Sequence, residues 1–464
     1  MVYSTIIFLL YFLPVLLAAY YLLPKLWHKN ILLFLFSLLF YFWGAGKLVI
    51  LLPLIGFSAW FFSLLIAKTR YKGFFLFISI LTFISVLIWL KYLGFIIDNL
   101  IYVGVKDLPS LKPLTTLGVS FFTFQAISYT IDVYRKNERF EKNPVFVILY
   151  ITMFPQLISG PFVRYKMLEP QMKSRNFDLP KFSEGVRRFI IGLGKKLLIA
   201  NTLSIVVGQI VDNDAITISP LVAWVAMIIF AIQIYFDFSG YTDMAIGVGK
   251  MLGFDLPENF NFPYISRSIT EFWKRWHMSF SAWIKDYIFN PLAMQLRYWG
   301  NAGIFISLMV TFFVCGLWHG PTWNFIMWGT TQGLFLGLEE LFLLKYLKKV
   351  KGFAVLYVLF IIVSCLVFFR TSNMNQAFKY YAVMFAPAKN GALGLNAFLA
   401  NKHIVVLFFG ILFSVPISLP AKLKTGKAGE VVKIIGTVLL VIILMLSIMK
   451  LLSETYNPFI YFKF

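Results

Sequence analysis

The chain has 464 residues, of which 60% are hydrophobic and 19% aromatic, and its mean hydropathy is +0.80. A water-soluble protein of this length could not bury so much apolar surface, and the sequence lacks the short alternating strands of an outer-membrane barrel. The formal net charge of +22 would suit nucleic acid or an anionic membrane. Because the basic residues cluster between apolar runs, as in positive-inside loops, we expect a membrane lipid environment and no nucleic-acid partner.

Apolar runs long enough to cross a bilayer recur along the chain, since a spanning helix needs about 20 such residues. The predicted spanning helices cover residues 2–23, 74–93, 114–133, 186–211, 221–238, 302–317, 323–343, 353–369, 403–419 and 431–451. The first run has no basic n-region and no cleavage site, which predicts a retained helix rather than a signal peptide. Residues 31–67 are long enough for two passes with a turn at 44–47, and the short run 146–160 is a candidate re-entrant segment.

These runs predict an all-α, polytopic integral membrane protein of about 11–13 transmembrane helices plus re-entrant or interfacial helices. The sequence contains no internal repeat, flexible linker or soluble domain, so we expect a single membrane-embedded domain over residues 1–464. The basic joints expected in the cytoplasm are Lys25/Lys29, 68–72, 135–142, 345–351 and 422–433. The loops 104–113 and 371–401 and both termini are then expected outside.

Two stretches do not fit simple crossings. Residues 162–188 are polar and basic, and residues 237–300 mix polar and aromatic side chains. Within the second stretch, residues 273–287 predict an amphipathic helix that lies in the cytoplasmic interface or dips into the protein. Its apolar face consists of Trp273, Trp276, Phe280, Ile284 and Tyr287. Lys274 and Lys285 share another face.

His319 lies between two apolar runs, directly before Gly320 and Pro321, which should break the helix there. A titratable side chain at membrane depth is costly and is therefore a candidate functional group. Imidazole is also well placed to take or give a proton near neutral pH. The alternative interpretation is a hydrogen-bonded histidine of the core.

His277 lies on the amphipathic segment, where an ordinary interfacial histidine is the alternative to a functional one. Three polar residues are near enough in sequence to orient its ring: Ser279, Ser281 and Asp286. If His277 has a role in chemistry, we expect it to assist a more deeply placed group.

Two further candidates lie on the expected helices. Cys315 precedes His319 by four residues, so a continuous helix places both on one face. A thiolate beside a histidine could carry an acyl group, and a small packed core residue is the alternative. Asp237 and Asp243 flank an expected Ser-Gly turn, where they could orient a histidine or cap the next helix.

Several of these segments resemble the membrane-bound O-acyltransferase (MBOAT) family. The two signature regions correspond to residues 272–283, Phe-Trp-Lys-Arg-Trp-His-Met-Ser-Phe-Ser-Ala-Trp, and 316–320, Gly-Leu-Trp-His-Gly. Residues 156–162, 235–241 and 457–462 are similar to the branch that contains the bacterial alginate O-acetylation transferase. One departure is Gln332, because many relatives carry a histidine at that position.

The resemblance implies an MBOAT fold around a central tunnel, in the inner membrane of a bacterium. It implies that His319 is the acyl-transfer histidine and that His277 is a second catalytic or orienting residue. The side chains expected to line or support the tunnel are Trp318, Trp323, Asn324, Asp237, Ser279, Asp286 and Cys315. Trp318, Trp323 and Phe325 would exclude the water that would otherwise hydrolyse the donor.

The implied reaction moves an acetyl or other short acyl group from a cytoplasmic thioester, such as acetyl-CoA, to an extracytoplasmic acceptor. The product would be an O-acetylated secreted or cell-wall polysaccharide, made with the help of an SGNH-hydrolase-like protein outside the membrane. The candidates for binding the donor phosphates, or for ordinary positive-inside charges, are Arg164, Lys195, Lys196, Lys274 and Arg275. We expect no permanently bound cofactor and no metal, since the four histidines are scattered.

Two other functions stay open at this point. A sister branch transfers D-alanine to teichoic acid, although residues 290–292 and 321–325 look more like the acetyl branch. A function of a different class is a solute transporter or polymer flippase that uses His319 as a proton relay. Transporters are often built from internal repeats, and their absence from this sequence counts against it.

Overall fold

The structure is a computed structural model that describes residues 1–106, 108–109, 118–136, 140–157, 160–213, 217–387, 390–418, 420 and 425–453. These residues form helices and no β-strand, arranged in two compact units. The first unit contains Met1–Phe189 and Thr242–Pro257, and the second contains Ile190–Tyr241 and Glu258–Phe464. The predicted motif at 457–462, and parts of those at 114–133, 156–162, 403–419 and 422–433, lie outside the described residues. The expectation of a single domain stays a prediction.

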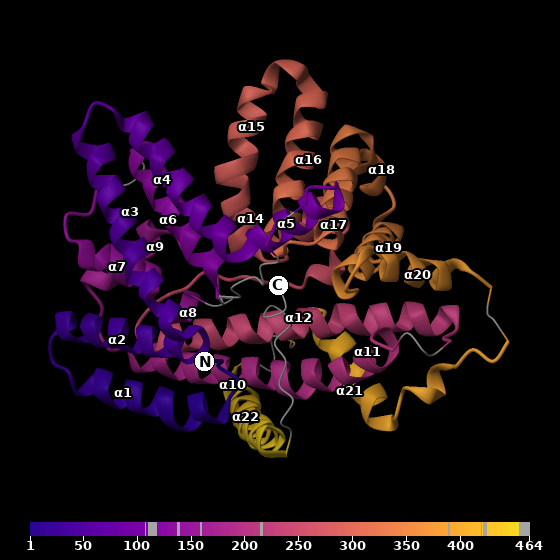
Figure 1. Cartoon of the computed structure of the whole chain (residues 1–464). Helices are drawn as coiled ribbons and strands as arrows, with labels where there is room; N and C mark the ends of the chain where they lie inside the picture. The colour runs from indigo at the N-terminus through magenta and orange to yellow at the C-terminus, as the bar shows by residue number, and fades with distance from the viewer. Residues whose placement is uncertain are drawn as a thin grey trace. The chain divides into compact units, whose positions relative to one another are not determined.

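Figure 1 labels most of the helices of both units. The helices of the first unit are α1 (Leu13–Leu22), α2 (Leu26–Ala45), α3 (Leu51–Lys68), α4 (Lys72–Leu87), α5 (Leu93–Tyr102), α6 (Val119–Tyr134), α7 (Pro144–Thr152), α8 (Phe154–Leu157) and α9 (Tyr165–Lys173). Two helices contribute residues to both units, α10 (Leu179–Gly194) and α12 (Pro220–Met251). The helices of the second unit are α11 (Thr202–Val211), α13 (Ile269–Trp273), α14 (Met278–Ile284), α15 (Asn290–Gln295), α16 (Gly300–His319), α17 (Trp323–Leu338), α18 (Leu344–Leu347), α19 (Lys351–Arg370), α20 (Met374–Phe385), α21 (Asn401–Phe413) and α22 (Gly426–Ser453).

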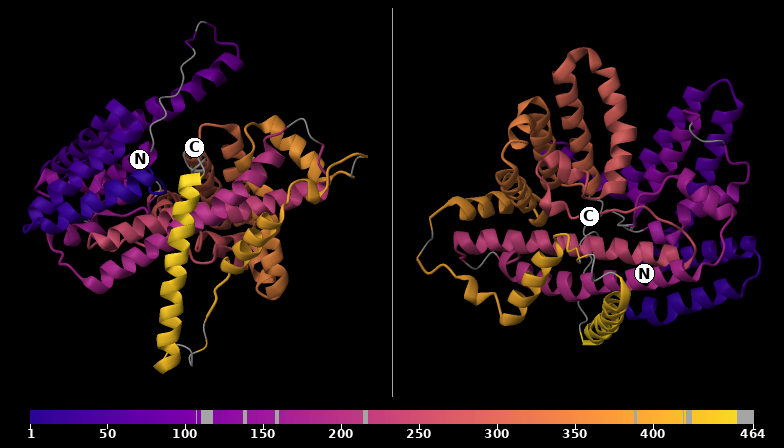
Figure 2. Two further views of the ribbon diagram at one scale, coloured as in Figure 1. Left: turned by 90° about the horizontal axis from the view of Figure 1, so that it is seen from below. Right: turned by 180° about the vertical axis from the view of Figure 1, so that it is seen from behind.

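Seven segments of the described chain are long and apolar enough to cross a membrane: Leu26–Lys68, Lys72–Tyr102, Leu179–Val211, Pro220–Met251, Arg297–His319, Lys351–Arg370 and Gly426–Ser453. The shorter apolar helices are Phe8–Leu22 and Asn401–Phe413. The predicted all-α, multi-pass membrane protein is therefore confirmed, and the finer count of about 11–13 crossings stays a prediction. Figure 2 shows α22 as one long helix. Only 11% of its most apolar 18-residue stretch is buried, as expected for a lipid-facing helix.

The turn predicted at 44–47 is confirmed. α2 ends at Ala45, and Gly46 has a φ of 54°, a conformation that glycine reaches without steric cost. The candidate re-entrant run 146–160 forms the short helices α7 and α8 instead of one spanning helix. The segment from 31 to 67 thus supplies two helices, as its length required.

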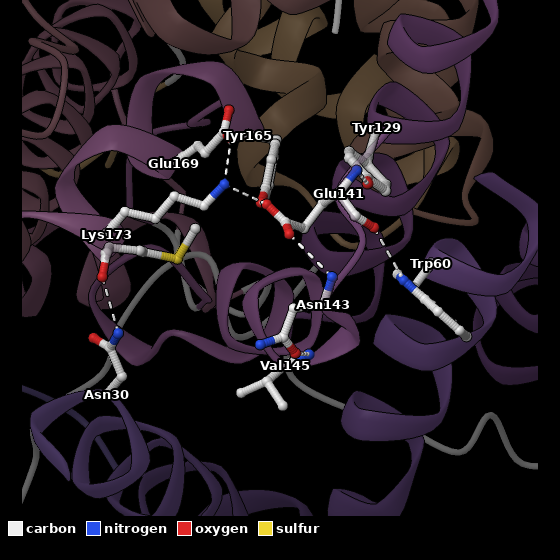
Figure 3. Close-up of polar contacts among 10 residues, drawn as sticks. Asn30, Trp60, Tyr129, Glu141, Asn143, Val145, Tyr165, Glu169 and Lys173 are labelled. Atoms are coloured by element: carbon white, nitrogen blue, oxygen red, sulfur yellow. Dashed lines mark hydrogen bonds and ion pairs between the residues drawn. The ribbon is translucent and has the colours of Figure 1, made fainter. Parts of the chain in front are cut away.

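In the first unit, the loop before α7 carries a buried carboxylate, Glu141, which is only 8% exposed. Figure 3 shows that the donors converge on it from several elements. The Tyr165 hydroxyl of α9 and the Asn143 N–H each donate to the carboxylate at 3.0 Å, and the indole of Trp60 in α3 donates to the Glu141 carbonyl at 3.1 Å. Lys173 at the end of α9 completes the set with an ion pair of 2.5 Å.

These contacts set the ionisation of Glu141. Burial alone would raise its pKa, but the hydrogen bonds from Lys173, from the Asn143 N–H and from Tyr165 outweigh burial and lower the pKa below the usual range. Lys173 also pairs with Glu169 at 2.6 Å, one helical turn earlier in α9. The carboxylate is therefore ionised at neutral pH and ties α9 to the start of α7, while the backbone carbonyl of Glu141 holds Trp60 of α3.

In the second unit, α16 and α17 pack at very short range because glycines face each other. A Cβ atom on Gly316 would overlap the carbonyl oxygen of Phe325, and one on Gly329 would overlap the carbonyl oxygen of Phe312. Only glycine permits this approach, which brings the end of α16 against the start of α17. The close contact places His319, the last residue of α16, beside the side chains of α17.

The structure corrects the prediction for residues 235–243. Ser239 and Gly240 do not form a turn, since α12 continues through them to Met251. Gly240 instead allows close helix packing, because a Cβ atom there would lie 2.7 Å from the Gly192 carbonyl oxygen. Asp237 therefore caps no helix. It forms a buried ion pair of 2.6 Å with Lys196, and within the first unit Asp243 pairs with Arg188 at 2.9 Å.

The prediction of one continuous helix over 273–287 is also wrong. α13 ends at Trp273, and α14 begins only at Met278. Asn259 causes the break by supplying acceptors from outside the helix. Its carbonyl accepts the Met278 N–H at 2.9 Å, and its side-chain oxygen accepts the Ser279 N–H at 3.2 Å and the Ser279 hydroxyl at 2.8 Å. The predicted faces are nevertheless confirmed: Trp273, Trp276, Phe280, Ile284 and Tyr287 are buried, whereas Lys274 and Lys285 are exposed.

Candidate active site

His319 is buried at the point where α16 ends, and it is 5% exposed. The predicted break at Gly320 and Pro321 is confirmed. The chain becomes extended at Gly320, and the Thr322 side chain caps the start of α17. His319 therefore lies at a helix end, as the sequence predicted, and the short link to α17 explains why its ring faces residues of that helix.

Aromatic rings surround His319. Its ring centroid lies 4.8 Å from Trp318, 4.7 Å from Trp328 and 5.2 Å from Phe369, in each case edge to face. Phe325 follows at 6.1 Å in a stacked arrangement. Such walls exclude water and lower the local dielectric constant, so any charge that develops at the imidazole interacts strongly with its surroundings.

A partly open cavity lies beside His319, with about 420 Å³ of empty space that includes the solvent at its mouth. Its lining is mostly apolar and comes from α12, α13, α16, α17, α19 and the loops next to α13: Ile234, Tyr264, Phe272, Trp273, Trp276, His319, Trp328, Gln332, Ile362, Leu366 and Phe369. Among the polar lining groups, the Gln332 side-chain oxygen accepts a hydrogen bond from the Trp273 indole at 3.2 Å. A mostly apolar pocket with few polar groups is the usual form of a small-molecule site.

His277 is held in a rare backbone conformation, with φ at 45° and ψ at 52°. A non-glycine residue adopts this left-handed region seldom and at some cost. Its Nδ1 lies 3.0 Å from the side-chain oxygen of Asn259. The Ser279 N–H donates to the same atom of Asn259, so that atom is the side-chain amide oxygen, Oδ1. Since this oxygen can only accept, Nδ1 of His277 must carry the hydrogen.

Burial lowers the pKa of His277 to about 3, so the ring is neutral at physiological pH. With hydrogen on Nδ1, the lone pair of the neutral ring is on Nε2. The ring stacks on Phe280 at 4.9 Å and meets the edge of Phe238 at 4.7 Å. His277 is therefore a neutral, oriented imidazole and not a surface cation.

Trp318 connects the surroundings of the two histidines. Its ring centroid lies 6.1 Å from that of His277 and 4.8 Å from that of His319, and it stacks on Phe280 at 4.1 Å. Residues 42 positions apart in the sequence thus share one aromatic wall. What this arrangement can do chemically is proton transfer in a dry site next to a small-molecule cavity.

Comparison with known proteins assigns the family. Residues 114–382 match the model of MBOAT, the membrane-bound O-acyltransferase family. The chain belongs to this family. It is 32% identical to the probable alginate O-acetylase AlgI of Azotobacter vinelandii and 33% identical to that of Pseudomonas putida, with 100% of both chains covered in each case. It is 32% identical to the peptidoglycan O-acetyltransferase of Helicobacter pylori, over 85% of this chain and 80% of the relative.

A more distant similarity is to the teichoic acid D-alanyltransferase of Bacillus subtilis, which is 31% identical over 51% of this chain and 62% of the relative. These MBOAT relatives are acyltransferases, so this chain is a membrane acyltransferase of the bacterial inner membrane. The family assignment therefore favours an acyltransferase over the transporter hypothesis. The match covers α13 to α19, where both histidines lie.

The MBOAT site omits one predicted wall residue. Trp323, the first residue of α17, is 55% exposed, because the break at Gly320 leaves it at the helix start and away from the packed face. Trp328 of α17, and not Trp323, is among the described residues that line the cavity. Asn324 is buried, but it donates to the backbone and hydroxyl oxygens of Thr371 at 2.9 and 3.0 Å, which ties α17 to the end of α19.

The residues predicted to orient His277 divide into different roles. Ser279 shares the Asn259 oxygen with the ring, whereas the Ser281 hydroxyl donates to the Trp276 carbonyl at 3.3 Å. Asp286 accepts a hydrogen bond from Asn290 at 3.3 Å. Sequence reasoning missed Asn259 as a site residue. Its only signal was a Pro- and Asn-rich loop, and hydrophobic periodicity cannot show which histidine such a loop reaches.

Two of the residues predicted to bind donor phosphates are engaged in ion pairs within the second unit. Lys196 is 1% exposed and is committed to Asp237, so it is not available as a surface phosphate ligand. Arg275 pairs with Glu271 at 2.9 Å. Lys274 is exposed and Lys195 is half-buried in the second unit, whereas the half-buried Arg164 belongs to the first. Cys315 is buried in α16 one turn before His319, as the continuous helix predicted.

Proposed function

We propose that this MBOAT protein transfers an acetyl group from a cytoplasmic thioester, acetyl-CoA, to an extracytoplasmic acceptor in the O-acetylation of a polysaccharide. The observation that carries the proposal is the buried His319 beside an aromatic-walled cavity of about 420 Å³. The relatives aligned over both full chains are named as alginate O-acetylases, whereas the D-alanyltransferase relative aligns with 51% of this chain. Acetyl transfer is therefore preferred to D-alanyl transfer.

The chemistry needs one base and one leaving thiol. A ring nitrogen of His319 takes the proton of the acceptor hydroxyl as its oxygen attacks the thioester carbonyl. The C–S bond then breaks, the new ester C–O bond remains, and the proton passes from the imidazolium to the departing thiolate. The thioester is already activated, so positioning and proton transfer account for the main part of the required rate enhancement.

His277 has a positioning or assisting role in this scheme. Asn259 fixes its tautomer and its orientation, and its neutral Nε2 can accept a hydrogen bond from a group in the reaction path. Holding a neutral imidazole in a strained backbone conformation is consistent with a function that depends on placement. The rings of Trp318, Trp328 and Phe369 keep bulk water from the thioester, which would otherwise hydrolyse it.

We infer the direction of transfer from the positive-inside joints, which predict the loops that face the cytoplasm, where acetyl-CoA would bind. The acceptor side then faces outward, where an SGNH-hydrolase-like partner would pass the acetyl group to the polysaccharide. The group crosses the membrane through the protein while the bulky, charged part of the donor stays inside.

The test uses the full-length protein in liposomes, with labelled acetyl-CoA on one face and the partner and polysaccharide on the other. We expect label on the acceptor only when the donor is on the face of the basic joints. Transfer from a D-alanyl carrier and not from acetyl-CoA would favour the teichoic acid function. No acyl transfer from either donor would contradict the proposal.

Cys315→Ser separates direct attack from a covalent acyl-cysteine route. Direct attack predicts transfer close to the wild-type rate, since Cys315 would only fill space in α16. A covalent route predicts loss as complete as that caused by removing His319, together with a trapped thioester on the wild-type protein that mass spectrometry would detect.

A further inference from the structure

The first unit contains a second, partly open cavity, with about 290 Å³ of empty space that includes the solvent at its mouth. Four cationic side chains line it: Lys29 of α2, Arg175 of the link between α9 and α10, Lys181 of α10 and Lys250 of α12. Tyr20, at the end of α1, is among the aromatic residues that line it, and Asp178 is its acidic lining residue. Such a surplus of positive charge around one cavity indicates an anionic ligand.

Two of the four cations are already neutralised. Lys181 pairs with Asp255 at 2.7 Å, and Lys250 pairs with Glu184. Asp178 is exposed, and its carboxylate accepts the backbone N–H of Lys181 at 3.3 Å. The charge of the cavity is then set by the two remaining cations, Lys29 and Arg175, against the carboxylate of Asp178, which leaves a positive surplus.

Lys29 and Arg175 have no carboxylate partner within ion-pair distance in the described part of the chain. The guanidinium of Arg175 donates to three neutral oxygens: the Tyr20 hydroxyl at 2.8 Å, the Gln171 carbonyl at 2.8 Å and the Asn30 side chain at 2.7 Å. A guanidinium has five N–H donors, so these three bonds leave it further donors for a ligand. Both cations are half-buried and therefore bear a desolvation cost.

Aromatic rings hold these two cations in place without neutralising them. The Lys29 Nζ lies 5.1 Å and the Arg175 Cζ 5.8 Å from the centroid of the Tyr20 ring. Arg175 also lies 4.2 Å from the Phe254 ring. The Tyr20 hydroxyl donates to the Leu252 carbonyl at 2.9 Å, which fixes the ring. Cation–π contacts position a charge but leave its hydrogen-bond donors available.

We propose that this cavity binds a phosphate group, with Lys29 and Arg175 as its two principal ligands. A phosphate offers several acceptor oxygens, which match the point charge of an ammonium and the planar fork of a guanidinium. Burial also lowers the pKa of Arg175, a cost that a bound anion offsets. The site is distinct in its residues from those of the acyl-transfer proposal and does not rest on it.

The phosphate could belong to the headgroup of an anionic lipid or to a soluble phosphorylated molecule, and two measurements separate these sources. Delipidated full-length protein is titrated with inorganic phosphate by calorimetry. In parallel, native mass spectrometry compares retention of dioleoylphosphatidylglycerol with that of dioleoylglycerol, which lacks the phosphate. Binding in the first measurement supports a soluble ligand, and selective retention in the second supports a lipid headgroup.

Lys29→Met removes one ligand charge and keeps an unbranched side chain. We expect binding to weaken on the order of tenfold, because a hydrogen bond to a charged group is lost. Lys25→Met, on the same joint but outside the cavity lining, is the matched control and should bind as the wild type does. Lys29→Gln repeats the test if the methionine variant does not give a monodisperse protein.

Two results would overturn the proposal. One is the absence of binding in both measurements with the wild-type protein. The other is an equal loss of binding in Lys29→Met and Lys25→Met, which would show that only the overall positive charge of the surface attracts phosphate.

Discussion

Glu141 and His319 are both buried polar residues, yet their surroundings differ in kind. Glu141, 8% exposed, receives hydrogen bonds from Tyr165 and the Asn143 N–H and an ion pair from Lys173. His319, 5% exposed, is enclosed by aromatic rings and borders a cavity. The charge of Glu141 is satisfied by contacts within the protein, whereas His319 borders space that a substrate can occupy.

The difference shows how a buried polar group can be assigned to stability or to chemistry. A carboxylate whose oxygens are taken up by neighbouring elements holds those elements together. An imidazole that lies in a dry aromatic wall beside a cavity can exchange a proton with a ligand bound in that cavity. Substitution at the two places should therefore affect different measurements: transfer rate at His319 and folding stability at Glu141.

The largest effect is expected for His319→Ala. Removal of the base should reduce acetyl transfer by roughly 10²–10⁴-fold, because general base catalysis supplies about that factor. The protein should remain monodisperse in detergent, since the side chain borders a cavity. Labelled acetyl transfer from acetyl-CoA measures the effect, and a variant that fails to fold would place His319 with Glu141 as a structural residue.

Asn259→Ala should have the next largest effect. It removes the acceptor of His277 Nδ1–H and of both Ser279 donors, so the ring loses its fixed tautomer and orientation. Transfer should fall on the order of tenfold to a hundredfold, mainly in kcat, because misplacement weakens the transition state more than substrate binding. His277→Asn should keep more activity than His277→Ala, since an amide can still hydrogen-bond. Equal loss in both would count against a positioning role.

The segment 273–287 offers a smaller and more local comparison. Trp276 is 8% exposed and lines the His319 cavity, whereas Lys274 is exposed. Trp276→Ala should therefore reduce transfer by about tenfold through a looser cavity wall, and Lys274→Ala should leave it nearly unchanged. Rates of both variants in the same membranes provide the measurement. Equal and small effects would mean that the segment is a surface anchor only.

Glu141→Gln should have the smallest effect on transfer and a clear effect on stability. At neutral pH we expect a loss of about 1–3 kcal/mol, the cost of weakening hydrogen bonds to a buried charge. The folded-state pKa of Glu141 is lowered, so its contribution is present above the unfolded-state pKa of about 4.3 and is lost as pH falls through the folded-state pKa. Thermal unfolding should thus separate wild type and variant at pH 7 and no longer separate them in strong acid.

Much of the fold and part of the site follow from the sequence, because they depend on local rules. Long apolar runs required membrane helices, Gly46 permitted a turn, and Gly320-Pro321 ended α16 at His319. The helical spacing of Trp273, Trp276 and their partners correctly indicated a buried face.

What the sequence could not show were contacts between distant segments. Gly240 looks like a turn former until a neighbouring backbone is known to lie 2.7 Å from its missing Cβ. The pairing of Asp237 with Lys196 and of His277 with Asn259 joins positions that no periodicity relates. The break of the segment at His277 has the same origin, since its cause is an acceptor supplied by another loop.

The most direct test of His319 as the base is rescue of a cavity variant by an added base. His319→Gly leaves a vacancy beside a cavity of about 420 Å³, into which free imidazole can diffuse. We expect the variant to be inactive alone and to recover acetyl transfer in proportion to added imidazole, with rescue by other azoles following their basicity. If His319→Gly transferred acetyl groups at the wild-type rate without any added base, the result would contradict the account.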